Sequence, residues 1–428
     1  MSKPPRPATD GEARWALLVL FVVALFNYVD RSLLSILQVP IKAELGLSDA
    51  QLGALTGLSF ALFYASAALP LARLVDRWRR TWIMAAALAV WSGMTALSGF
   101  ATGFITLMLF RIGVALGEAA SVPATHSLLS DYFRPNWRGT AFAVWAFASP
   151  IGIMLGVFSG GWLTEELGWR NSFAVIGLAG LLLVAPLILL REPLRGQSDE
   201  GGTPAAVEPP PLREAIARLW GSVAFRLLVA GTTLQGFAYV SLLNWSPSFY
   251  ARVHELPLSE VAVWAALIIG VGGGGGALLG GAIVDRLARQ DRRWYGWAPA
   301  TTCLLAAPFG LIQFLTPSTD VSIAVGFVAA FLAGAYVAPV NATAQSLVPP
   351  SMRGFTSAVL LLIPTIFGAG LGPFLTGVAS DVFATYLGLG ASSLRYALAL
   401  ILLASVAAAA FLFRMGGHLG RGPSGATV

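Results

Sequence analysis

Four ionisable residues lie inside long apolar stretches of this chain: Asp30 and Arg31 in one stretch, Arg111 and Glu118 in another. A charge at bilayer depth costs roughly 3 to more than 10 kcal/mol, so such residues normally face an internal cavity. Carboxylates in such a place can exchange protons, and a guanidinium can bind an anion. The four residues therefore indicate a polar pathway through an apolar protein.

Helical geometry predicts which of these side chains share a direction. Glu118 follows Arg111 by seven residues, and about 100° of rotation per residue returns it to nearly the same helix face. Asp30 lies at a depth in its own stretch similar to that of Arg111. We therefore expect Asp30, Arg111 and Glu118 to line one pathway. Arg31 points about 100° away from Asp30, and we expect it to snorkel or pair near the outer surface.

These residue types suggest a proton-coupling hypothesis. Desolvation favours the neutral form of a carboxyl group, whereas a nearby guanidinium favours its charged form. If Arg111 changes its distance from Asp30 or Glu118 between conformations, the carboxylates load and release protons. An anionic head group can compete for Arg111 through two parallel hydrogen bonds. The alternative is that Asp30 and Arg111 form only a structural ion pair between two helices.

The composition predicts an all-α polytopic membrane protein. Hydrophobic residues make up 56% of the chain, charged residues only 11%, and the mean hydropathy is +0.74. A soluble domain carries about a quarter charged residues. Apolar runs of roughly 20 residues are long enough to cross a bilayer. We count twelve, at residues 15–37, 51–74, 81–101, 104–126, 139–163, 172–190, 224–249, 258–283, 297–315, 321–347, 354–380 and 393–414.

The distribution of basic residues predicts the orientation. With a cytoplasmic amino terminus, most arginines fall on the cytoplasmic side, including the clusters at 73–80 and 286–293, so both termini are expected inside. The pI near 9.8 follows from this bias and needs no nucleic acid partner. Because 25 of the 27 basic residues are arginine, we expect a GC-rich bacterial source and an inner-membrane location.

Several other classes of protein lack support in the sequence. The single cysteine, Cys303, can form neither a disulfide framework nor a cysteine metal cluster within the chain, and we expect no cofactor. The two lysines, Lys3 and Lys42, do not follow a phosphate-binding glycine loop. The three histidines are far apart in sequence. We therefore predict that the protein is not an enzyme.

A central break and an internal repeat predict two similar halves. Residues 192–220 are rich in Pro, Gly and acidic residues and are expected to form a flexible cytoplasmic linker between bundles at 1–191 and 221–428. Asp76-Arg77 recurs as Asp285-Arg286, 209 residues later. Three motifs follow this pattern, since Arg138-Gly139 recurs as Arg353-Gly354, and Gly152, Gly156 and Gly161 recur as Gly368, Gly372 and Gly377. The pattern indicates a duplicated six-helix unit.

This organisation resembles the major facilitator superfamily. The family's Gly-x-x-x-Asp-Arg loop is kept at Gly281, Asp285 and Arg286, whereas Ala72 replaces the glycine in the first copy. The resemblance implies two six-helix bundles and transport by alternating access. It also implies gating or helix-packing roles for residues near these loops, namely Asp76, Arg77, Arg80, Arg138, Asp285, Arg286 and Arg353. We expect Arg138 and Arg353 to pair with these loops or with cytoplasmic carbonyl groups.

A narrower resemblance is carried by Asn27-Tyr28-Val29-Asp30-Arg31 together with Gly117-Glu118-Ala119. These elements are similar to those of the Spinster branch, which implies an amphiphilic lipid substrate and proton linkage. The expected function is export of an anionic lipid-like molecule. Two alternatives stay open: a carrier for a small organic anion or drug, and a non-transporting sensor derived from a transporter.

The remaining candidates are polar residues inside predicted spans. Gln235 and Tyr239 are four residues apart in the seventh span, and Tyr336 and Asn341 lie in the tenth. They are expected either to contact a head group or to form ordinary interhelical bonds. The expected substrate contacts are thus Asn27, Arg111, Glu118, Gln235, Tyr239, Tyr336 and Asn341. The expected partners are protons, an amphiphilic or anionic small molecule and membrane lipids, with the protein acting as a monomer.

Overall fold

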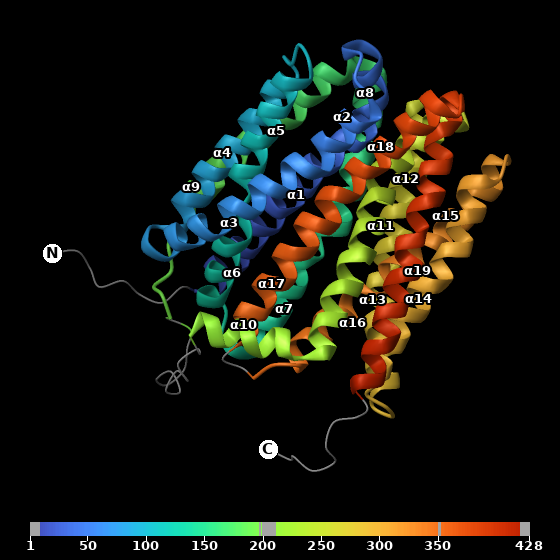
Figure 1. The fold of residues 1–428 in the computed structure, drawn as a ribbon. Coiled ribbons are helices and arrows are strands. Elements are labelled where there is room, and N and C mark those ends of the chain that lie inside the picture. The colour runs from blue at the N-terminus through green and yellow to red at the C-terminus, as the bar shows by residue number, and fades with distance from the viewer. Residues whose placement is uncertain (1–8, 197, 199–210, 350–351, 420–428) are drawn as a thin grey trace. The chain divides into compact units, whose positions relative to one another are not determined.

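The fold was obtained as a computed structural model that describes residues 9–196, 198, 211–349 and 352–419 (Figure 1). Every regular element in these ranges is helical, as the composition predicted. Eleven helical segments of the described chain are long and apolar enough to cross a membrane. One of them, Pro135–Leu189, spans 55 residues and contains two of the twelve predicted spans. They join at Gly168, whose φ of 79° interrupts the helix.

Contacts divide the chain into two compact units. The first comprises Met1–Leu47 and Ser59–Ala206, and the second Ser48–Leu58 and Val207–Val428. The helices of the first are α1 (Asp10–Leu45), α3 (Ser59–Arg77), α4 (Arg80–Ser98), α5 (Phe104–Glu118), α6 (Ser121–Tyr132), α7 (Pro135–Ala146), α8 (Ala148–Leu182) and α9 (Val184–Leu189). The short helix α2 (Asp49–Gly53) and the π-helical turn Ala54–Leu58 group with the second unit.

The second unit repeats the helical pattern. Its other α-helices are α10 (Leu212–Gly221), α11 (Val223–Val253), α12 (Leu258–Leu267), α13 (Gly274–Ala288), α14 (Trp294–Leu315), α15 (Thr319–Gly334), α16 (Val337–Ser346), α17 (Arg353–Ile363), α18 (Leu371–Tyr386) and α19 (Ser393–Leu419). The π-helical segments Ile268–Gly273 and Pro364–Gly370 interrupt two of its spans. A short 3₁₀ turn, Gly390–Ser392, precedes α19.

Two of the three repeated glycine pairs have the same structural role in both units. A Cβ added at Gly152 would lie 2.6 Å from the Leu25 carbonyl oxygen of α1, and one at Gly368 would lie 2.8 Å from the Thr233 carbonyl oxygen of α11. Only a residue without a side chain allows such close helix packing. The repeat read from the sequence thus corresponds to equivalent contacts, between α8 and α1 in the first unit and at α11 in the second.

The second unit also holds a polar cluster around α2. Arg252 at the end of α11 donates to Asp49 Oδ1 over 2.9 Å, and Ser380 donates to Asp49 Oδ2 over 2.6 Å. The carboxylate of Asp381 accepts the backbone N–H groups of Asp49 and Ala50. Negative charge at a helix amino terminus is favourable, which explains why α18 holds α2 in place.

The predicted linker at 192–220 contains regular structure. Helix α10 occupies Leu212–Gly221, with Ala215 and Leu219 packed against Phe225 and Met352. Leu212 and Ile216 remain exposed. The mixed composition of the segment hides this short amphipathic helix, because Pro and Gly are concentrated before it. Residues 197 and 199–210 lie outside the described ranges.

Candidate functional site

Asp30 lies at the centre of a buried polar group in the first unit. It belongs to α1 and is 3% exposed. Thr95 of α4 donates a hydrogen bond to Asp30 Oδ2. Asp30 Oδ1 is 3.6 Å from Nη1 of Arg111 in α5, which makes an ion pair but is too long for a hydrogen bond. The predicted pairing of Asp30 with Arg111 is therefore present, in a loose form.

Arg111 is buried, and some of its hydrogen-bond donors have no acceptor in the described structure. It is 2% exposed, and in the described part of the chain its Nε and Nη1 donate no hydrogen bond. Its guanidinium lies 6.0 Å from the centre of the Phe60 ring. Leaving a buried charged donor without an acceptor costs more than leaving a neutral one. Such a group is suited to receive an anionic acceptor from outside the protein.

Glu118 is paired with a residue that the sequence analysis placed elsewhere. Arg31 Nε donates to Glu118 Oε2 over 2.5 Å, and the Glu118 side chain is completely buried. Arg31, which was expected to snorkel or pair near the outer surface, thus pairs with this buried carboxylate, while its own side chain is 29% exposed. Glu118 Oε1 accepts no hydrogen bond from the described residues, although the Asn27 amide lies beside the carboxylate.

Aromatic rings of α3 and α1 explain the position of Arg31. Its guanidinium lies 4.7 Å from the centre of the Phe60 ring, 4.9 Å from that of Tyr64 and 5.7 Å from that of Tyr28. Cation–π contacts of this kind stabilise a guanidinium that has left water. Phe60, Tyr64 and Thr95 are thus site residues that sequence reasoning missed. The four-residue spacing of Phe60 and Tyr64 was the available signal.

The charges of this group cancel, but several of its hydrogen-bonding atoms have no partner in the described structure. Asp30 with Arg111 and Glu118 with Arg31 form two ion pairs carried by α1 and α5. The second is short and enclosed by rings, whereas the first is long and leaves donors and an acceptor open. We call Asp30, Arg31, Arg111 and Glu118 the charged group. It can exchange a proton at Asp30 and accept an anion at Arg111.

A second buried arginine of the first unit has a different environment. Arg80, predicted as a gating residue, is 0% exposed and forms ion pairs with Asp131 and with Glu192, the latter at 2.7 Å. It also donates to Ser127 and to the Pro193 carbonyl oxygen. We call these five residues the Arg80 network. Arg80 therefore ties α4 and α6 to the segment after α9.

Glu192 lies outside the membrane spans. Burial raises its pKa, but hydrogen bonds from the Thr81 backbone N–H and from Arg80 outweigh burial, and the pKa falls below its ordinary value. Glu192 is therefore charged near neutrality and needs Arg80 as a partner.

The other predicted gating residues are mostly at the surface. Asp76 and Arg77 are exposed at the end of α3, as are Asp285 and Arg286 in α13. Tyr295 donates to Asp285 over 3.4 Å. Arg138 donates to the carbonyl oxygens of Ser130 and Phe133, which agrees with the expected carbonyl contacts. Arg353 begins α17, and its side chain lies outside the described structure.

The second unit brings together neutral polar groups. Tyr239 and Tyr336 meet edge to face, with ring centres 6.2 Å apart. Gln235, one turn from Tyr239 on α11, is completely buried, and neither amide atom has a hydrogen-bond partner in the described part of this unit. Asn341 is exposed and donates to the Val337 carbonyl oxygen of its own helix, so it does not join them.

The described residues contain no group of three or more His, Cys, Asp or Glu side chains arranged to hold a metal ion. Cys303 is buried in α14. His126, a minor candidate for proton relay, packs edge to face against Phe142 and Trp145.

Comparison with known proteins identifies the class. The Major Facilitator Superfamily model matches residues 20–373, and the chain belongs to that superfamily of membrane transporters. A solved structure described as a bacterial homolog to the human lysosomal transporter Spinster superimposes with a TM-score of 0.89 and 29% identity, covering 96% of this chain and 98% of that one. Within the superfamily, the chain is Spinster-like.

Two further relatives are named as transporters of different kinds. An MFS-type efflux pump of Mycolicibacterium smegmatis is 36% identical over 91% of this chain and 89% of its own length. A probable L-galactonate transporter of Escherichia coli is 30% identical over 69% of this chain and 66% of its own length. Family and fold indicate an integral membrane transporter rather than an enzyme.

Proposed function

We propose that this protein is a proton-coupled secondary transporter that moves an amphiphilic organic anion together with protons by alternating access, across a bacterial inner membrane. The observation that carries the proposal is the loose Asp30–Arg111 pair. It is buried, yet Asp30 Oδ1 and two nitrogens of Arg111 have no hydrogen-bond partner in the described residues. A pair kept only for stability would be expected to close, because unsatisfied buried charges are costly.

In the proposed cycle Asp30 and an anionic substrate compete for Arg111. A proton arriving at Asp30 Oδ1 neutralises the carboxylate and removes its attraction for the guanidinium. The Arg111 guanidinium is then free to donate hydrogen bonds to a substrate carboxylate or phosphate. When Asp30 loses the proton, its negative charge competes again and favours release of the anion. One arginine thereby links proton movement to substrate movement.

The remaining candidates have supporting roles in this proposal. Arg31 holds Glu118 Oε2, so Oε1 and the neighbouring Asn27 amide are left to contact polar groups of the substrate. In the second unit, Gln235, Tyr239 and Tyr336 offer uncharged groups suited to hydroxyl or apolar parts of a molecule.

The relatives support transport while differing in cargo. The Mycolicibacterium smegmatis relative is named an efflux pump with no cargo stated, and the galactonate relative favours a small organic anion. The Spinster-like branch of the chain favours a lipid-like substrate. All three are compatible with Arg111 as an anion site only if the molecule carries a negative group. We therefore propose an amphiphilic anion first and a small organic anion second.

The test is flux into proteoliposomes under imposed pH gradients. Lysophosphatidylglycerol, a sugar acid and a cationic dye would be compared as substrates for wild type, Asp30→Asn and the surface control Glu214→Gln. We expect a pH gradient to drive anion uptake in wild type and the control. In Asp30→Asn we expect exchange without gradient-driven accumulation. Full gradient-driven transport by Asp30→Asn would refute the assignment, and no flux of any probe would favour the sensor alternative.

A further inference from the structure

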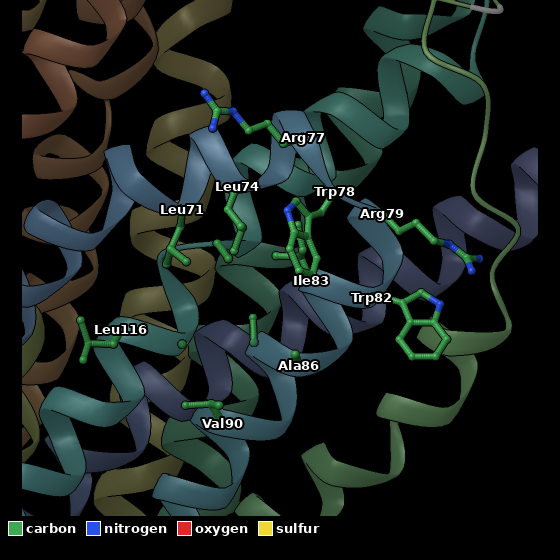
Figure 2. Close-up of a pocket in the computed structure, with 13 residues that line it drawn as sticks. Leu71, Leu74, Arg77, Trp78, Arg79, Trp82, Ile83, Ala86, Val90 and Leu116 are labelled. Atoms are coloured by element: carbon green, nitrogen blue, oxygen red, sulfur yellow. The ribbon is translucent and has the colours of Figure 1, made fainter.

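A groove along the outside of the first unit is separate from the charged group. It has a volume of about 860 Å³ and is lined by α3, α4 and the junction of α5 with α6. Figure 2 shows its lining, with Leu71 and Leu116 on one side and Trp78, Ile83 and Val90 along its length. The volume lies within the range of about 300–1,000 Å³ typical of pockets for small molecules.

Small residues create this hollow. Helix α4 presents Ala86 and Ala87 between the larger Trp82 and Val90, and α6 begins beside Ala120. Gly117 brings α5 close to α4, since an added Cβ would lie 2.9 Å from the Trp91 nitrogen. Helices α4 and α5 thus pack closely at Gly117. Beside that contact, Ala86 and Ala87 are too small to fill the surface and leave an apolar trough.

Charge is confined to one end of the groove. Among its lining residues only Arg77 and Arg79 are charged, and both are exposed at the turn between α3 and α4. Their side chains leave this turn on either side of Trp78 (Figure 2), and the Arg79 guanidinium lies 5.5 Å from the centre of the Trp82 ring. Arg195 adds a third guanidinium there by donating to the Val75 and Trp78 carbonyl oxygens.

Few acidic side chains lie near Arg77 and Arg79 at this end of the groove. No acidic side chain pairs with Arg77 or Arg79 in the described ranges, and Asp76 is the exposed acid in the same turn. Asp131 and Glu192 are both held in ion pairs by Arg80, the residue after Arg79. Trp78 and Trp82 are 68% and 53% exposed, as is common for tryptophan at a membrane interface.

We propose that this groove binds one anionic phospholipid of the cytoplasmic leaflet. The phosphate lies beside Arg77 and Arg79, and an acyl chain follows the trough past Ala86 toward Val90 and Leu116. The groove matches an amphiphile, because its cations lie at one end, which the distribution of arginines predicts to be cytoplasmic, and the rest of its lining is apolar. Arginine-rich clusters facing the cytoplasm attract the anionic lipids of that leaflet.

The proposal is tested by counting bound lipids on the full-length protein by native mass spectrometry. Detergent-solubilised protein would be titrated with phosphatidylglycerol or phosphatidylcholine of equal chain length. We expect one phosphatidylglycerol to bind more tightly than the first phosphatidylcholine. The double variant Arg77→Gln/Arg79→Gln should weaken phosphatidylglycerol binding roughly 25-fold, at about fivefold per arginine, and leave phosphatidylcholine unchanged.

Two further variants separate the groove from general surface charge. Ala86→Trp fills the trough and should remove the tight site for phosphatidylglycerol while all arginines remain. Arg289→Gln/Arg292→Gln removes two exposed cytoplasmic arginines of the second unit and should change nothing at this site. Equal phosphatidylglycerol binding by wild type, the Arg77/Arg79 variant and Ala86→Trp would overturn the proposal. Displacement of the bound phospholipid by the transported anion would also overturn it.

Discussion

Two buried arginines of the same unit, Arg80 and Arg111, differ in how fully the protein satisfies them. Arg80 binds two carboxylates, a serine and a carbonyl oxygen, so all three of its nitrogens donate. Arg111 has one carboxylate at 3.6 Å and two nitrogens that donate nothing within the described structure. Burial alone therefore does not distinguish a structural arginine from a functional one. The completeness of the hydrogen bonding is the basis on which we propose different roles for the two arginines.

The largest expected effect comes from removing Arg80. Arg80→Gln leaves Asp131 and Glu192 without their cation in a buried place, which should lower the free energy of unfolding by about 3–5 kcal/mol. Thermal unfolding of the purified protein in detergent would measure this loss. Transport per folded molecule should persist. Arg289→Gln serves as an exposed control, and an unchanged melting temperature for Arg80→Gln would contradict the structural role of the Arg80 network.

Replacing Arg111 should produce the opposite pattern. Arg111→Gln removes the proposed anion site, and hydrogen bonds to charged groups are worth about 1.5–3 kcal/mol, so transport should fall roughly 10- to 150-fold. The melting temperature should move much less than in Arg80→Gln, because the Asp30 pair is already loose. Flux assays and thermal unfolding on the same preparations would compare the two arginines. Strong destabilisation with normal transport would reverse their assigned roles.

Gln235 extends the comparison to an uncharged group in the second unit. Gln235→Leu removes two buried amide atoms that lack partners, so the protein should unfold at the same or a higher temperature. If the amide contacts substrate, KM should rise about two- to tenfold with little change in kcat. Thr232→Val, which breaks only a bond to its own helix, is the neighbouring control. An unchanged KM would remove Gln235 from the substrate contacts.

The smallest expected effect concerns the pH dependence of the Arg80 network. The pKa of Glu192 is lowered in the folded protein, so its contribution to stability is complete above about pH 4.5 and is lost as pH falls through the folded pKa. Wild type should therefore exceed Glu192→Gln in stability at pH 7 by up to about 1 kcal/mol. Melting temperatures measured from pH 7 to pH 4 should converge, and a constant difference would argue against this origin.

The sequence predicted the fold well because hydropathy and glycine spacing are local signals. The apolar runs located the spans, and the recurrence of Gly152 and Gly156 as Gly368 and Gly372 anticipated equivalent helix contacts. The junction of two spans at Gly168 agrees with the predicted break between residues 163 and 172. Helix α10 was missed because composition averaged over a long segment conceals a short amphipathic helix.

The candidate site was less predictable because it depends on which helix faces which. Rotation along α1 separates Arg31 from Asp30 correctly, but the sequence could not show that α3 supplies Phe60 and Tyr64 on that side. The partners of Arg80 are likewise 51 and 112 residues away along the chain. The coupling and substrate roles of Asp30, Arg111 and Glu118 stay predictions.

The close contact between α1 and α8 restricts how the Asp30–Arg111 distance can change. A Cβ at Gly156 would lie 2.5 Å from the Val29 carbonyl oxygen, immediately before Asp30, so the two backbones nearly touch there. Sliding α1 by one residue along α8 would force a side chain into that contact. Helices α1 and α8 must therefore move together as one rigid body. Any widening of the Asp30–Arg111 gap consequently requires a displacement of α5 or a new rotamer of Asp30 or Arg111.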